Sequence, residues 1–257
     1  MTTWTLDSGM SEASFDLDDG ARLTRLRLAG RDVLVTHAGQ EPMWWGSFVM
    51  APWTSLLRDG AWLDGVQHDL QLDPADSAWH GVARHSAWSR AGDTLTTPLS
   101  GAWPWGGVAT LAPKLEAATL SVTLTVTATE SRMPAAVGWH PWFVRQLDGV
   151  EVELHVPEDA LAQERDLADA PTGRWVAPTR QWNDCVRTRG PIDLRYPGVG
   201  SLRVEYSSEF VTLFSSHEQG VCVEPVTSAA ERLDDVLDPG ESVSITISVT
   251  WFEGEPG

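Results

Sequence analysis

Strict alternation of apolar and polar residues is the feature of this sequence that most constrains its fold. From Thr119 to Ala128 every second residue is apolar, and the residues between them are threonines and a serine. The segment Val243–Trp251 repeats this pattern, and Val150–Val156 repeats it over a shorter stretch. A period of two turns one row of side chains toward a core and the other toward solvent, so each segment predicts a half-buried antiparallel strand.

Helical periodicity is nearly absent from the rest of the chain. Only Leu161–Leu167 predicts a turn or two of helix. The 22 glycines and 16 prolines are spread between the apolar segments, where turns between strands require them. A chain of 257 residues with this pattern predicts one all-β domain, residues 1–257, built as a sandwich or a barrel. Four shorter segments also predict strands: Arg22–Leu28, Ser201–Tyr206, Val211–Ser215 and Val221–Glu224.

The charge balance excludes some classes of partner. The sequence has 36 acidic and 18 basic residues, a formal net charge of −18. Such a surface repels phosphate backbones and anionic lipids, which disfavours nucleic acid and membranes as partners. No secretory signal is visible, and no apolar run reaches the ~20 residues that span a bilayer. Two cysteines, Cys185 and Cys222, have no metal-ligand spacing. We therefore expect a cytoplasmic protein without a bound metal.

Three polar residues lie in apolar surroundings that set them apart. His80 and His140 have aromatic neighbours and a nearby glycine, whereas the other five histidines lie in polar contexts. Glu224 ends an apolar strand segment, where a carboxylate is costly to bury unless it is paired or used. His140 and Glu224 each precede a proline, which favours extended backbone and a stiff attachment for the side chain.

Tryptophan is unusually abundant, with 14 residues. An aromatic face can stack on the C–H face of a sugar ring, and an indole N–H can donate to a hydroxyl. Most tryptophans in a wide β core are fillers, so only those beside polar candidates point to function. Trp142, two residues after His140, is the clearest of these.

Four segments, in this order, resemble the aldose 1-epimerase family of galactose mutarotase-like proteins. The most specific is Gly138–Phe143, which is similar to the family's Gly-x-His-Pro-aromatic-Phe signature. Together the segments span most of the chain, which makes a chance resemblance improbable. The other three are Met50–Trp53 with Arg58-Asp59-Gly60, His80–Arg84 followed by Trp88, and Cys222–Thr227 followed by Leu237–Glu241.

The resemblance implies a fold, an activity and a set of roles. The fold is a large antiparallel β-sandwich of the galactose mutarotase-like type with little helix. The activity is interconversion of the α and β anomers of a free aldose, with no cofactor, by a monomer or homodimer. Glu224 takes the place of the general base, His140 that of the general acid, and His80 hydrogen-bonds the sugar. An acidic substrate-binding position falls on Asn183 or Asp184, and the family motif does not decide between them.

One departure from the family pattern concerns an arginine. The family's Asn-Arg pair falls on Ser55 and Leu56, so the arginine is missing there. Arg58, two residues on, is our candidate to replace it, because a spacing of two restores the same face of a strand.

The residue types suit the reaction. A base removes the proton from the anomeric hydroxyl while an acid delivers one to the ring oxygen; the ring opens and closes from the other face. We expect an ionised Glu224 and a charged His140, placed on opposite sides of the ring. Two alternatives stay open: a hexose-6-phosphate mutarotase, with cations such as Arg84 and Arg132 near the site, and a carbohydrate-binding protein without turnover.

Overall fold

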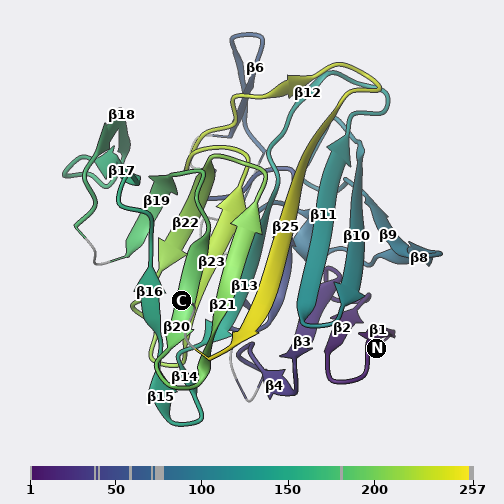
Figure 1. The fold of residues 1–257 in the computed structure, drawn as a ribbon. Coiled ribbons are helices and arrows are strands. Elements are labelled where there is room, and N and C mark those ends of the chain that lie inside the picture. Colours follow the sequence, from purple (N-terminus) through teal and green to yellow (C-terminus); the bar gives the residue numbers. More distant parts are fainter. Residues whose placement is uncertain are drawn as a thin grey trace.

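The chain folds into two large antiparallel sheets that pack face to face, as Figure 1 shows. The computed structural model describes residues 2–37, 39, 41–57, 60–70, 72, 78–179 and 182–254. Helix within these residues is limited to two 3-10 turns, Pro42–Trp44 (η1) and Ala83–His85 (η2). The predicted all-β sandwich is therefore confirmed. No helix in the described ranges is long and apolar enough to cross a membrane.

The larger sheet has 11 strands and carries the candidate site. Their order is β1-β2-β3-β5-β13-β23-β22-β19-β17-β18, with β4 paired to β3. Their bounds are β1 Thr3–Asp7, β2 Glu12–Asp16, β3 Arg22–Leu28, β4 Arg31–Asp32, β5 Ser47–Met50, β13 Gly138–Val144, β17 Leu161–Arg165, β18 Pro171–Val176, β19 Asn183–Arg187, β22 Phe210–Phe214 and β23 Gly220–Val226.

The second sheet has eight strands in the order β16-β20-β21-β25-β11-β10-β9-β8 and lies in front of the first in Figure 1. Its strands are β8 Ser89–Ala91, β9 Thr94–Pro98, β10 Val108–Glu116, β11 Thr119–Thr127, β16 Glu153–His155, β20 Ile192–Tyr196, β21 Gly200–Tyr206 and β25 Ser242–Glu253. Three two-stranded pairs complete the fold: β6 Ala61–Leu63 with β7 Val66–His68, β12 Met133–Pro134 with β24 Val236–Leu237, and β14 Gln146–Leu147 with β15 Val150–Glu151.

The alternation in the sequence corresponds to the two faces of the second sheet. Along β11 the apolar residues are fully buried in the main core, and the intervening hydroxyl residues are partly exposed. The outer hydroxyls pair across the strands: Thr119 with Thr250 at 3.0 Å, and Ser121 with Ser248 at 3.2 Å. Cross-strand pairs of this kind contribute roughly 0.2–1 kcal/mol each. The strands predicted over Thr119–Ala128 and Val243–Trp251 are confirmed as β11 and β25, each with its apolar face buried.

Two local predictions were wrong. Leu161–Leu167 contains no helix; it begins with strand β17, which is paired to β18 and β19. Backbone pairing on both sides outweighs a weak local helical preference. The segment Val150–Val156 is not one strand, because β15 pairs with β14 whereas β16 pairs with β20 in the other sheet.

Candidate active site

The candidate site lies on the face of the 11-stranded sheet that turns away from the main core. On β13, Trp139 and Phe143 belong to the core between the sheets, so His140 and Trp142 point to the opposite face. On β23, Val221 and Val223 belong to that core in the same way. Both faces of β13 and β23 are buried, which explains why these segments are apolar almost throughout.

Strand register makes His140 and Glu224 direct neighbours. Gly138 pairs with Val226 and Trp142 with Cys222, so the antiparallel register sets His140 opposite Glu224. The same row continues on both sides, with Phe48 opposite His140 on β5 and Thr212 opposite Glu224 on β22. Two residues some eighty positions apart in the sequence therefore meet through backbone pairing.

His140 and Glu224 form a buried pair. The His140 Nε2 atom lies 3.3 Å from Glu224 Oε1, and the two residues are only 5% and 4% exposed. Burial raises the pKa of Glu224 to about 8. Burial, and then the neighbouring His80 with smaller effects of Arg22 and Arg84, lowers the pKa of His140 well below its usual value of 6.5. At neutral pH the pair therefore holds one proton between an imidazole nitrogen and a carboxyl oxygen.

This protonation state corrects the expectation from the sequence. We expected an ionised glutamate and a charged imidazole on opposite sides of a sugar ring. Desolvation disfavours both charges, and the two groups lie side by side. The sequence could not reveal this, because composition does not tell how deeply a strand segment is buried.

His80 completes the polar group, and a tight loop positions it. His80 has a positive φ of 60°, a conformation that is uncommon outside glycine. The next residue, Gly81, packs so closely that an added Cβ would lie 2.0 Å from the Ala51 carbonyl oxygen. The His80 imidazole lies edge-on to that of His140, with ring centroids 5.0 Å apart. The three residues that the sequence singled out, His80, His140 and Glu224, therefore lie together in one cluster.

A backbone contact fixes the tautomer of His80. Its Nδ1 atom lies 3.0 Å from the carbonyl oxygen of Thr54. A carbonyl can only accept, so Nδ1 carries the proton and donates it. Burial lowers the pKa of His80 to about 4, so the ring is neutral and Nε2 is left as an acceptor. His80 can therefore accept a hydrogen bond from a hydroxyl group.

Phe48, Arg22 and Arg84 form the wall behind the pair. The sequence analysis named Arg84 as a nearby cation but did not assign Phe48 or Arg22 to the site. Phe48 stacks on His140 with ring centroids 4.4 Å apart. The Arg22 guanidinium lies 5.3 Å and that of Arg84 5.9 Å from the Phe48 ring centroid. Both arginines are almost fully buried. Phe48 lies opposite His140 on the neighbouring strand β5. This position can be recognised only when the pairing of the two strands is known.

Trp142 packs inside an aromatic cluster. It is 1% exposed, and its indole N–H donates to the carbonyl oxygen of Met43 at 2.7 Å. Its ring lies 5.3 Å from that of Trp44 and 5.2 Å from that of His217. A tryptophan with its N–H engaged and its ring buried has a packing role here. Trp44 and Phe214 are only partly buried and are the rings nearer to solvent.

The register separates the remaining candidates. Asn183 pairs with Phe214, which pairs with Cys222, so Asn183 lies on the face of the site and is exposed. Asp184 pairs with the core residue Leu213 and alternates toward the other face. Burial raises the pKa of Asp184, although the charge of Arg165 opposes this. Geometry therefore favours Asn183. Arg58 lies outside the described residues.

Cys222 forms a triangle with the pair. Its Sγ atom lies 3.6 Å from His140 Nδ1, and the thiol also interacts with the Glu224 carboxyl group. The three side chains are the candidate metal-ligand set among the described residues, with ligand atoms within 4.8 Å of one another. Cys222 and Glu224 contact opposite nitrogens of the ring, so no single ion can replace both contacts. The arrangement as it stands suits hydrogen bonding rather than coordination.

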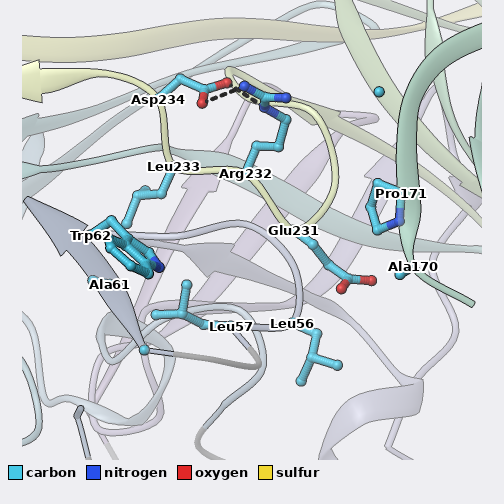
Figure 2. Close-up of a pocket in the computed structure, with 12 residues that line it drawn as sticks. Leu56, Leu57, Ala61, Trp62, Ala170, Pro171, Glu231, Arg232, Leu233 and Asp234 are labelled. Carbon is cyan, nitrogen blue, oxygen red and sulfur yellow. Dashed lines mark hydrogen bonds and ion pairs between the residues drawn. The ribbon is translucent and has the colours of Figure 1, made fainter. Parts of the chain in front are cut away.

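A cavity of about 500 Å³ lies beside the loop that carries His80. Leu56, which lines the cavity, forms a backbone bridge with Trp79, the residue before His80. In Figure 2 the side chains of Trp62, Leu56 and Leu57 lie on one side of it, and Glu231 and Pro171 lie on the other. Leu56 stands where the family's arginine falls. A cavity of this size is within the range of small-molecule sites, roughly 300–1,000 Å³.

Ser55 connects this cavity to His80. Its hydroxyl accepts a hydrogen bond of 2.5 Å from the backbone N–H of Glu231, which lines the cavity. Its carbonyl oxygen accepts one of 3.2 Å from the backbone N–H of His80. The Glu231 carboxylate is held by Arg165. The floor of the cavity and the His80 loop are therefore one hydrogen-bonded unit.

Solved structures share this fold along nearly their full length. A putative aldose 1-epimerase from Escherichia coli K12 matches with a TM-score of 0.79 and 19% identity, covering 98% of this chain and 99% of that one. A galactose mutarotase-like protein from Lactobacillus casei matches at 0.80 and 17%, covering 98% and 100%. A galactose 1-epimerase from Lactobacillus acidophilus matches at 0.78 and 15%, covering 98% and 94%.

These likenesses define the class of fold. No family sequence model matches the chain, and no curated protein is similar to it in sequence. At identities below 20% the structures establish a galactose mutarotase-like sandwich and leave the activity open. The resemblance seen in the motifs is thus confirmed at the level of the fold.

Proposed function

We propose that this protein is an aldose 1-epimerase that interconverts the α and β anomers of a free aldose. The observation that carries the proposal is the buried His140–Glu224 pair, with 3.3 Å between Nε2 and Oε1. The fold shared with proteins named as epimerases supports it. His80, with an acceptor nitrogen beside the pair, supports it further.

A pair that shares one proton fits the reaction closely. The anomeric oxygen and the ring oxygen are bonded to the same carbon, so a base and an acid that lie side by side can reach both. In ring opening, the bare nitrogen of His140 takes the proton of the anomeric hydroxyl while protonated Glu224 gives its proton to the ring oxygen, the reverse of the roles that the resemblance implies. After rotation about the bond to the end carbon, closure moves both protons back. The pair returns to its starting state without a cofactor.

The cavity favours an uncharged sugar over a hexose 6-phosphate. A phosphate group needs unpaired cations. Around the cavity, Arg232 is paired to Asp234 through two contacts of 2.7 and 2.9 Å, and Glu231 adds a further carboxylate. Arg132 is half-exposed and lies near two aspartates. Since Glu231 is itself paired with Arg165, the charges of this lining are matched in pairs, and no described residue of the lining offers an unpaired cation to a phosphate.

The missing arginine favours the second candidate function, sugar binding without turnover. Leu56 cannot hydrogen-bond a sugar or stabilise negative charge on an opening ring. Retention of a one-proton His–Glu pair favours the epimerase, because binding alone does not need a shared proton. Rates and affinities measured on the same preparation separate the two functions.

Polarimetry on freshly dissolved α-glucose and α-galactose tests the proposal. His140→Ala and Glu224→Gln should each lower the rate by about 10²–10⁴-fold, since each removes one partner of the proton transfer. A matched control exists on the surface, where His155 Nε2 lies 3.6 Å from Glu153 Oε2. His155→Ala should keep the wild-type rate. Wild-type rates in both site variants contradict the proposal, and binding without acceleration establishes the lectin-like alternative.

A further inference from the structure

Cys222 lies between the two ends of the candidate acid–base pair. It is two residues before Glu224 on β23 and points to the same face, and it is completely buried. Register places it opposite Trp142 and diagonally from His140. Its sulfur reaches the Nδ1 atom of His140 at 3.6 Å, within range for a hydrogen bond to sulfur.

The contacts of the three side chains form a closed circuit. His140 Nδ1 contacts the Cys222 sulfur, the thiol hydrogen-bonds to the Glu224 carboxyl group, and Glu224 Oε1 contacts His140 Nε2. A neutral thiol is a weak donor and a weak acceptor, and a protonated carboxyl group is a donor and an acceptor. A neutral imidazole has one of each. Each group can therefore donate once and accept once.

The circuit can run in either direction, and the contact between Cys222 and Glu224 selects one of them, because it raises the pKa of the thiol and lowers that of the carboxyl group, as a thiol that donates to the carboxyl group does. With the thiol donating to the carboxyl group, the proton that Glu224 keeps at neutral pH is donated to Nε2, 3.3 Å from Oε1, so Nε2 must be the bare nitrogen. The proton of the neutral ring is then on Nδ1, where the sulfur of Cys222 accepts it. In a neutral imidazole the hydrogen bond of one nitrogen decides the state of the other.

We propose that Cys222 is a positioning residue that holds His140 in the Nδ1–H tautomer and keeps its Nε2 atom directed at Glu224. Its role in turnover rests on the proposed epimerase function, whereas its effect on the tautomer does not. The thiol does not act as a nucleophile, because burial and the adjacent Glu224 raise its pKa well above its usual range. It acts as a neutral hydrogen-bonding group.

The direct test is nitrogen-15 NMR of histidine-labelled protein, which distinguishes the two neutral tautomers. His140→Gln identifies the His140 signals by their loss. The wild type and Cys222→Ser should show His140 protonated on Nδ1, because a hydroxyl group can take the place of the thiol. Cys222→Ala should show a mixture of tautomers. The proposal is overturned by an Nε2–H tautomer in the wild type, or by an unchanged Nδ1–H tautomer in Cys222→Ala.

Activity gives a second readout with a matched control. Removal of one hydrogen bond of ordinary strength should lower kcat about fivefold in Cys222→Ala, with KM little changed and partial recovery in Cys222→Ser. The control is Cys185→Ala, the other buried cysteine on the same face, which hydrogen-bonds to Thr212 and Ala230 instead. It should leave the tautomer and kcat unchanged.

The outcomes separate the two proposals. A tautomer shift in Cys222→Ala in a protein that never accelerates mutarotation refutes the epimerase and leaves the positioning role in place. If the protein accelerates mutarotation and Cys222→Ala leaves both the His140 tautomer and kcat unchanged, only the positioning role is refuted. If Cys222→Ala does not fold, an Nε2–H tautomer of His140 in the wild type still refutes the positioning role.

Discussion

Glu224→Gln should change how the stability of the protein depends on pH, independently of any activity. The folded structure raises the pKa of this carboxyl group from 4.5 to about 8. The native state therefore keeps a proton that the unfolded chain has released. A group of this kind contributes stability that is fully present below about pH 4.5 and is lost as the pH rises through about 8.

The magnitude follows from the pH interval. Between about pH 6 and pH 8 the glutamate is ionised in the unfolded chain and mostly protonated in the folded one. Each pH unit costs about 1.4 kcal/mol of unfolding free energy while the folded carboxyl group stays protonated, and less as the pH approaches 8, so the loss is about 2 kcal/mol. The amide that Glu224→Gln introduces does not titrate, and it can still donate to Nε2 of His140 at the position now held by the carboxyl group.

Urea unfolding of both proteins at several pH values measures this difference. The unfolding free energy of the wild type should fall relative to that of the variant by about 2 kcal/mol between pH 6 and 8. The exposed pair supplies the control, because Glu153→Gln should run parallel to the wild type. Parallel curves for the wild type and Glu224→Gln refute the conclusion that Glu224 is protonated at neutral pH.

Three further outcomes are expected. The mutarotation rate, followed by polarimetry, should fall as the pH rises through about 8, because the His140–Glu224 pair then loses its shared proton; a rate that keeps rising contradicts this. The stability contributed by His80, with its pKa lowered to about 4, should fall as the pH decreases below about 6.5, because the unfolded chain then protonates this histidine and the folded chain does not. In acid unfolding curves the wild type should therefore lose stability relative to His80→Gln, in which the contribution of Glu224 is unchanged. Gly81→Ala should lower the melting temperature and remove roughly 3 kcal/mol or more of unfolding free energy, because a Cβ there meets the Ala51 carbonyl oxygen; an unchanged melting curve refutes the close packing.

The sequence by itself determined the type of fold and singled out the candidate site residues. Alternation in Thr119–Ala128 and Val243–Trp251 is a local property, since each strand repeats every two residues whatever it pairs with. His140 and Glu224 stood out because polar residues in apolar segments are rare. The short motifs around them added the resemblance.

Only the tertiary structure decided how these residues meet and in which state. Register is set by backbone pairing between distant strands, so the sequence did not show that His140 and Glu224 touch or that Phe48 stacks beside them. It also did not show that Asn183, rather than Asp184, shares their face. Protonation depends on desolvation by every neighbour at once, which is a property of the packed sheet and not of any segment.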